Sequence, residues 1–151
     1  MKLAVSADHA AVELRRLVLA HLRATGHDVT DLGGDDPCEP DDYPDRAAEL
    51  GREVAEGRAE LGILLCGSGA GACIAANKLR GVRAATCHDT FSAHQCREDD
   101  DANILCLGAR IVGPSLALEL VDTFLNARFS GLERHQRRLD KVLALEAAAT
   151  V

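Results

Sequence analysis

Residues 61–78 read LGILLCGSGAGACIAANK, and the predicted fold is built around this segment. Gly62 to Leu65 carries no polar side chain, as expected of a strand that is buried on both faces of a parallel sheet. Three alternating glycines follow, and the apolar residues then recur with helical spacing. The stretch therefore predicts a buried strand, a tight turn in which several N–H groups are uncovered, and a helix.

Cys66 lies at the start of that turn. Open α/β sheets bind ligands at the carboxyl ends of their strands, and a helix N-terminus attracts anions and lowers the pKa of a nearby thiol. Two interpretations follow from this stretch alone. Cys66 is a reactive thiolate beside an oxyanion or phosphate cradle, or it is a buried cysteine next to a glycine-rich turn.

The length and composition predict one domain over residues 1–151. A chain of 151 residues buries about two thirds of its unfolded surface without help from disulfides or metal ions. The formal net charge of −7 argues against a nucleic-acid or anionic-membrane partner. No charged leader precedes an apolar segment, so we expect a cytoplasmic protein. The six cysteines form no C-x-x-C pair, which favours reduced thiols and no metal site.

Strand-like segments alternate with segments of helical spacing along the whole chain. The predicted strands cover residues 2–7, 27–32, 62–65, 82–87 and 103–107. Consecutive parallel strands need a crossover, which a helix usually supplies. We therefore predict the α/β fold class, as a three-layer α/β/α sandwich around a five-stranded parallel, Rossmann-like sheet.

The functional residues of such a sheet gather at the carboxyl ends of its strands. This rule selects three segments, which are Asp8-His9, Cys66-Gly67-Ser68 and Cys87-His88-Asp89. A helix is expected over residues 88–97, followed by a solvated acidic loop at 98–101 that leads into the fifth strand. That loop would lie at the opposite edge of the sheet, so a second subunit would have to bring it to the site.

Three phosphate-binding motifs fit the glycine turn poorly. Residues 67–71, GSGAG, lack the G-x-G-x-x-G spacing of dinucleotide-binding proteins, although Asp89 after the next strand keeps that hypothesis open. A P-loop requires Gly-Lys-Ser/Thr, and here Ala72 and Cys73 follow the last glycine. A cysteine phosphatase loop requires an arginine six residues after the nucleophile, and Ala72 stands there.

A cationic segment lies near the C-terminus, in a helix expected over about residues 133–148. Arg134 and Arg138 are four residues apart and so share one helical face, where two guanidinium groups suit a phosphate. The alternative is a solvated helix with ordinary surface arginines. The acidic chain and the anion cradle favour the phosphate site.

Several motifs together match a known family over nearly the whole chain. They are Ala7-Asp8-His9-Ala10, Asp42-Tyr43-Pro44, Cys66-Gly67-Ser68-Gly69-Ala70-Gly71, Ile74-Ala75-Ala76-Asn77-Lys78, Gly108-Ala109-Arg110, and Arg134-His135-Gln136 with Arg138. Together they resemble the ribose-5-phosphate isomerase B and galactose-6-phosphate isomerase family. The resemblance implies a homodimer or dimer of dimers, with each active site built from two subunits. It also implies cofactor-free aldose–ketose interconversion of a phosphorylated sugar, such as ribose 5-phosphate in the pentose phosphate pathway, through an enediolate.

The resemblance also implies roles for individual residues. Cys66 corresponds to the base that moves the proton, because the glutamate of another branch is replaced here by Ala72. The enediolate oxygen would be stabilised by the Ser68 hydroxyl and by amides of the turn that contains Gly67, Gly69 and Gly71. Among the other residues, Asp8 would hold sugar hydroxyls, His9, Arg134 and Arg138 would bind the phosphate, and Tyr43 and Arg110 would line the pocket.

One segment departs from the family pattern. Members that open a sugar ring carry a His-Asn pair before the fifth strand, whereas this chain has Asp99-Asp100. In one alternative, Asp99 is a buried, protonated acid and Asp100 takes the substrate-binding position. In a second, the substrate is an open-chain sugar phosphate such as a tetrulose phosphate, which needs no ring opening. As a third alternative, a pentose phosphate opens spontaneously or with help from His88 or His94.

Two non-enzymatic hypotheses use the same residues. A sugar-phosphate-binding module without catalysis would keep the arginines and the glycine turn but would not need the thiol. A redox sensor would use Cys66 with Cys73 as its resolving cysteine. The retained thiol favours an isomerase in which Cys66, Ser68 and Asp99 are the catalytic candidates.

Overall fold

The computed structural model describes residues 1–34 and 36–149. Its centre is a sheet with strand order β2-β1-β3-β5-β4, in which every paired strand runs parallel to its neighbour. The strands are β1 (Lys2–Ala7), β2 (Asp28–Asp31), β3 (Leu61–Cys66), β4 (Ala84–Thr86) and β5 (Ile104–Gly108). The five-stranded parallel sheet confirms the prediction. The edge strands β2 and β4 are shorter than predicted, since each pairs on one side only.

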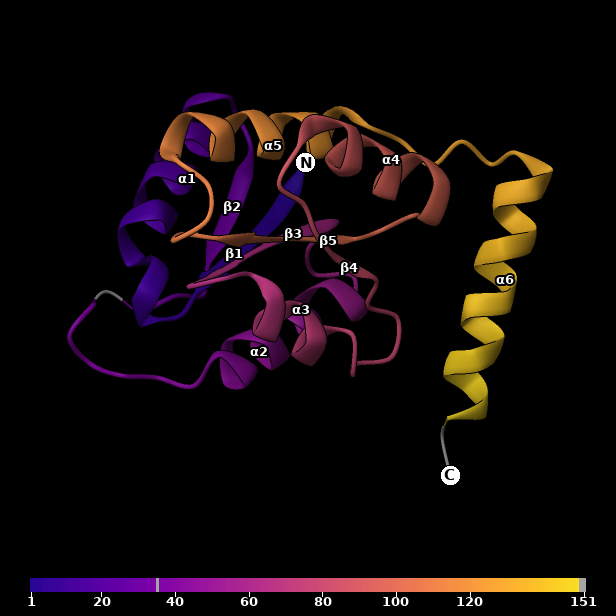
Figure 1. Cartoon of the computed structure of the whole chain (residues 1–151), viewed down its shortest axis with the longest axis horizontal. Coiled ribbons are helices and arrows are strands. Elements are labelled where there is room, and N and C mark those ends of the chain that lie inside the picture. The colour runs from indigo at the N-terminus through magenta and orange to yellow at the C-terminus, as the bar shows by residue number, and fades with distance from the viewer. Residues whose placement is uncertain (35, 150–151) are drawn as a thin grey trace.

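Helices cover both faces of the sheet and complete the predicted three layers (Figure 1). One face carries α1 (Val12–Ala24), α4 (Thr90–Asp100) and α5 (Pro114–Asn126), and the other carries α2 (Tyr43–Ala55) and α3 (Ala70–Ala76). A short 3-10 helix, His9–Ala11, links β1 to α1. No helix in the described part of the chain is long and apolar enough to cross a membrane.

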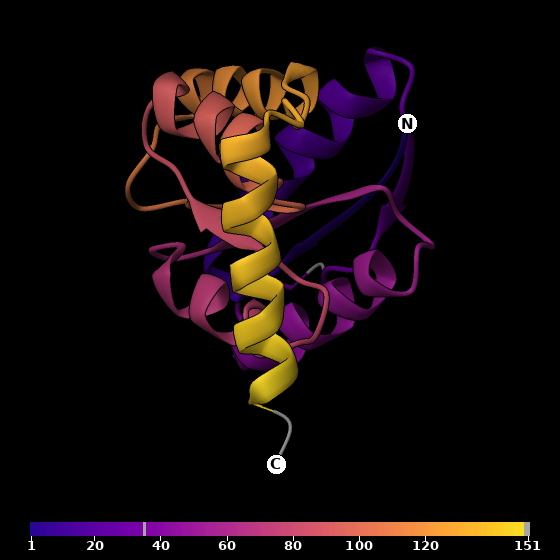
Figure 2. The ribbon, with the colours of Figure 1, turned by 90° about the vertical axis from the view of Figure 1, so that its right-hand side faces the viewer.

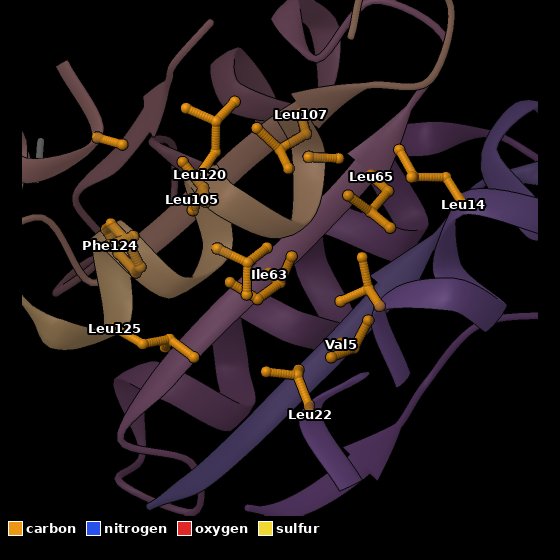
Figure 3. Packing of buried hydrophobic residues seen from close by; sticks show 14 of the residues in the cluster. Val5, Leu14, Leu22, Ile63, Leu65, Leu105, Leu107, Leu120, Phe124 and Leu125 are labelled. Carbon is orange, nitrogen blue, oxygen red and sulfur yellow. The ribbon is translucent and has the colours of Figure 1, made fainter. Parts of the chain in front are cut away.

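The alternation of side chains along β3 divides the core in two. Ile63 and Leu65 pack into the cluster beneath α1 and α5, together with Phe124 (Figure 3), whereas Leu64 and Cys66 pack toward α2 and α3. All six residues of β3 are buried. Cys66, the last residue of this buried strand, is therefore held at the carboxyl edge of the sheet.

The last helix, α6 (Glu133–Ala148), lies apart from the three layers. It runs along the β4 edge of the sheet and across its thickness (Figures 1 and 2). Within α6 only His135 and Leu139 are buried, while Val142 and Leu145 are 50% and 72% exposed. A helix that leaves so much apolar surface uncovered is a candidate for contact with another chain.

The predicted boundary between a helix and an acidic loop at residue 98 is wrong. α4 continues to Asp100, and Asp101 ends the helix in the left-handed conformation, at φ 49°. Arg83 and Arg97 donate to the Asp101 carboxylate over 2.7 and 2.9 Å. These contacts offset the unfavourable placement of acidic residues at a helix C-terminus.

Candidate active site

The glycine turn between β3 and α3 forms the floor of the candidate site. Gly69 lies at the N-cap of α3 with φ +80°, a conformation that favours glycine. Its N–H donates to the Sγ of Cys66 over 3.0 Å. The turn thus holds the sulfur of Cys66, a predicted catalytic residue, against the N-terminal end of α3.

The turn also packs closely against the end of β5. A Cβ atom on Gly108 would lie 2.5 Å from the Ser68 carbonyl carbon, and one on Gly69 would lie 3.1 Å from the Leu107 carbonyl carbon. Backbone hydrogen bonds from Ala109 to the Cys66 carbonyl and from Arg110 to the Gly67 carbonyl join the two segments. Their close approach places the Arg110 guanidinium beside the turn.

Asp8 follows β1 at the same edge of the sheet, next to Cys66 in the fold because β1 and β3 are paired. Its Oδ1 accepts a hydrogen bond from the Ala10 N–H over 2.9 Å, and the residue is 7% exposed. Burial raises the pKa of Asp8, and the Ala10 hydrogen bond only partly opposes that rise. A carboxylate in this position costs folding free energy whenever it is ionised.

We expect Asp8→Asn to stabilise the fold. A carboxyl whose pKa rises on folding destabilises the native state above that pKa, and the penalty fades as the pH falls toward the unfolded value. The amide keeps the capping acceptor without the charge, so the free energy of unfolding should rise by about 1 kcal/mol at pH 7. Urea unfolding at about pH 7 and pH 4 tests this, because the difference between variant and wild type should shrink at the lower pH. A variant less stable than wild type at neutral pH contradicts it.

These segments enclose a pocket of about 330 Å³ at the carboxyl edge of the sheet. Its lining residues are Asp8, His9, Ala10, Tyr43, Cys66, Gly67, Ser68, Gly71, Arg110 and Ile111. Tyr43 packs on Gly71, where a Cβ would meet its ring at 2.8 Å. Eight of the predicted site residues thus line one pocket, and Gly69 lies in the turn that supports it.

Four predicted site residues lie elsewhere in the chain. Asp99 and Asp100 are in the last turn of α4, which precedes β5 and therefore lies toward the opposite edge of the sheet. Arg134 and Arg138 are on α6. Of these four, Asp100 and Arg138 line a different and larger groove of about 650 Å³ between α6 and the β4 side. Within one chain, the structure does not bring these four residues to the pocket of Cys66.

Asp99 makes contacts that suit a carboxylate. The Gln95 side chain donates to its Oδ2 over 3.3 Å, and the buried His135 places Nδ1 3.4 Å from its Oδ1. Within one chain, the Asp99 side chain is 24% exposed. His94, another candidate acid, pairs with Glu98 at 3.4 Å, and neither His94 nor His88 lines the pocket.

Cys73 does not contact Cys66 as a resolving cysteine would. Its thiol donates to the Ala84 carbonyl over 3.3 Å. A hydrogen bond with Cys106 is the main cause that lowers the pKa of Cys73 to about 6, against the opposing effect of burial. Within the described ranges, no cluster of three or more His, Cys, Asp or Glu side chains is arranged to hold a metal ion.

A family model described as Ribose/Galactose Isomerase matches residues 3–142 of this chain. The chain belongs to the ribose/galactose isomerase family. It is 44% identical over 131 residues to D-erythrulose-4-phosphate isomerase of Pectobacterium atrosepticum, a match that covers 87% of this chain and 86% of that protein.

Solved structures of the ribose/galactose isomerase family share the whole fold. Ribose-5-phosphate isomerase B of Clostridium thermocellum has a TM-score of 0.96 at 41% identity, over 99% of this chain and 100% of that one. Ribose-5-phosphate isomerase B of Mycoplasma genitalium with bound ribulose-5-phosphate has a TM-score of 0.92 at 40% identity, over 97% and 96% of the two chains. The family resemblance and the fold predicted from the sequence are both confirmed.

The sequence did not predict two residues that lie beside the pocket of this protein. Asp41 bonds to His9, and Arg46 bonds to Asp41. Asp41 lies 32 positions from His9 along the chain. It belongs to a polar loop with several acidic residues, and no sequence pattern marks one of them as the partner of His9. No spacing rule connects such positions, so only the folded loop reveals the contact.

Proposed function

We propose that this protein interconverts the aldose and ketose forms of a phosphorylated sugar without a cofactor, with ribose 5-phosphate and ribulose 5-phosphate as the first pair. The observation that carries the proposal is the position of Cys66. Its sulfur is held by the Gly69 N–H at the edge of a pocket that is lined by a carboxyl, an imidazole, a hydroxyl and a guanidinium group. Such a pocket surrounds one candidate base with groups that bind sugar oxygens.

The reaction follows from this arrangement. The Cys66 thiolate removes a proton from the carbon beside the carbonyl, and the electron pair forms an enediolate. N–H groups of the turn at residues 67–71 and the Ser68 hydroxyl stabilise the enediolate oxygen. Cys66 then returns the proton to the former carbonyl carbon, while the hydroxyl proton passes from one enediolate oxygen to the other, which leaves the carbonyl group on the neighbouring carbon. Asp8 holds the sugar hydroxyls, and Tyr43 and Arg110 limit the pocket.

The phosphate site includes residues of two chains in this proposal. His9 comes from the chain that supplies Cys66, and Arg134 and Arg138 come from α6 of a second copy, in a homodimer or a dimer of dimers. The exposed apolar residues of α6 and the groove of about 650 Å³ beside it support a contact with another chain. The 1–151 domain, with α6 as its dimerising and phosphate-binding part, therefore works as an assembly.

A second candidate substrate is an open-chain four-carbon ketose phosphate. Such a sugar needs no acid for ring opening, which agrees with Asp99 being partly exposed and bonded to Gln95 and His135. The similarity to D-erythrulose-4-phosphate isomerase points to the same class of substrate. Asp99 and Asp100 would then contact the shorter sugar from the second chain.

A comparison of two substrates tests the proposed function. The purified protein is assayed with ribose 5-phosphate and with erythrulose 4-phosphate, and kcat/KM is measured for each. Turnover of the pentose assigns the ribose 5-phosphate reaction, while a preference of about 100-fold or more for the tetrulose assigns the second substrate. Binding of both sugars without turnover identifies a non-catalytic binding module instead.

The cellular setting belongs to the same proposal. We place the enzyme in the cytoplasm, in the pentose phosphate pathway if the pentose is its substrate. The proposal includes neither a nucleic-acid nor a membrane partner, in keeping with the formal net charge of −7. Its small-molecule partner in this proposal is the phosphorylated sugar.

A further inference from the structure

A polar contact joins the loop before α2 to His9, which lines the candidate site. The Oδ1 atom of Asp41 accepts the main-chain N–H of His9 over 2.7 Å and lies 3.0 Å from the ring Nδ1. On the other side of the carboxylate, Arg46 donates its Nε–H to Oδ2 over 2.7 Å. Arg46 also donates to the Leu32 carbonyl over 3.3 Å. The loop, α2 and the end of β2 therefore fix Asp41 in place.

The charge of Asp41 bears on which nitrogen of His9 carries a proton. Partial burial opposes ionisation of Asp41, but the hydrogen bonds from Arg46 and His9 lower the pKa of Asp41. An ionised carboxylate only accepts hydrogen bonds, so Nδ1 must donate. The Asp41 main-chain N–H also points at Nδ1 over 3.3 Å, a contact that would use Nδ1 as an acceptor. The 3.0 Å contact to the ionised carboxylate is shorter and charge-assisted, and it favours the proton on Nδ1.

With Nδ1 engaged, Nε2 is the ring nitrogen that remains for a ligand. No hydrogen bond to Nε2 is formed within residues 1–34 and 36–149. His9 lines the pocket that contains Cys66 and Ser68, and its side chain is 35% exposed. A neutral imidazole offers an acceptor at Nε2, whereas a protonated ring offers a donor that suits a phosphate oxygen.

We infer that Asp41 is a positioning residue, which holds the His9 ring so that its Nε2–H is presented to the phosphate of the substrate. The inference rests on the proposed function, since it assumes a phosphorylated sugar in this pocket. The carboxylate balances the charge of the imidazolium, and Arg46 keeps the carboxylate ionised and oriented. Arg46 of α2 thus contacts Asp41, Asp41 contacts His9, and His9 binds the substrate phosphate in this inference.

A double-mutant cycle on substrate affinity tests this role. Asp41→Asn is expected to raise KM for the sugar phosphate about tenfold and to leave kcat within about twofold, because the ring binds the phosphate and does not react. In the His9→Ala background, the same substitution should change KM by less than about twofold, since no ring remains to be positioned. Glu39→Gln is the matched control, because it removes a charge from the same loop without breaking a side-chain hydrogen bond or ion pair to any described residue, and it should leave KM unchanged. An equal effect of Asp41→Asn in both backgrounds, or an effect in neither, overturns the inference.

A spectroscopic measurement separates this inference from the proposed function. The ¹⁵N spectrum of the His9 ring at about pH 9, where imidazoles are neutral, reports which nitrogen carries the proton. We expect the proton on Nδ1 in the wild type and on Nε2 in a large part of the Asp41→Asn population. A wild-type ring protonated on Nε2 contradicts the inference even in an active enzyme. Failure of the wild type to isomerise any sugar phosphate removes the proposed function and leaves the tautomer result standing.

Discussion

Cys66→Ala should lower kcat for sugar-phosphate isomerisation by about 10³-fold and change KM by less than about threefold. General acid–base groups contribute typically 10²- to 10⁴-fold, and this variant loses the group that carries the proton. The turn and the other pocket residues remain, so substrate binding should survive. Steady-state kinetics on the preferred sugar, with isothermal calorimetry for binding, measure both quantities.

Cys73→Ala is the matched control for that experiment. Cys73 has a pKa lowered to about 6 and lies on the neighbouring helix α3, yet it does not line the pocket. Its removal should leave kcat within about threefold of wild type. If Cys66→Ala retains wild-type activity while Cys73→Ala loses it, the base has been assigned to the wrong thiol. A wild-type protein that reacts with mild oxidant at Cys66 and shows no isomerase activity favours the redox-sensor hypothesis.

Two inactive variants should restore activity when they are mixed. Cys66→Ala removes the base from one chain, and the double variant Arg134→Gln/Arg138→Gln removes the phosphate ligands that we assign to the other chain. In a hybrid dimer, one site has both defects and the other has neither. Random reassembly of equal amounts should therefore recover about a quarter of wild-type activity.

The double arginine variant alone should lose most of its affinity for the phosphate. Two charge-assisted contacts are removed together, so KM should rise about 100-fold or more. The mixing experiment decides where the arginines act, because sites built from one chain cannot be repaired by a partner. Refolding or subunit exchange is followed by mass spectrometry to show that hybrids form. Hybrids that form and remain inactive contradict a site shared between two chains.

The sequence predicted the parts of the site that depend on local rules. The apolar run before Cys66 predicted β3, and the following glycines predicted the turn, because each pattern follows directly from local backbone geometry and burial. The rule that ligands bind at the carboxyl ends of parallel strands then placed Asp8 and His9 beside Cys66, and all three line one pocket. The same rule also selected the segment Cys87-His88-Asp89, which does not line it.

The predictions that failed, and the contacts that were missed, depend on residues that are distant in sequence. The end of α4 was misplaced because Arg83, which lies before β4, stabilises the acidic segment at Asp101. The contact of Asp41 with His9 could not be found for the same reason. The surroundings of Asp99 also needed the fold, since His135 reaches it from another helix. Family resemblance supplies the roles of Arg134 and Arg138, and one chain alone leaves them away from the pocket.

Solvent deuterium uptake tests the central claim, that Cys66 moves a proton through an enediolate. The enzyme is incubated in D₂O with its preferred sugar phosphate until equilibrium, and NMR follows the carbons that exchange their hydrogen. We expect deuterium at C1 of the ketose and at C2 of the aldose, with uptake about 10³-fold slower in Cys66→Ala. Isomerisation that reaches equilibrium with no deuterium in either sugar, even after many turnovers, would contradict proton transfer by Cys66.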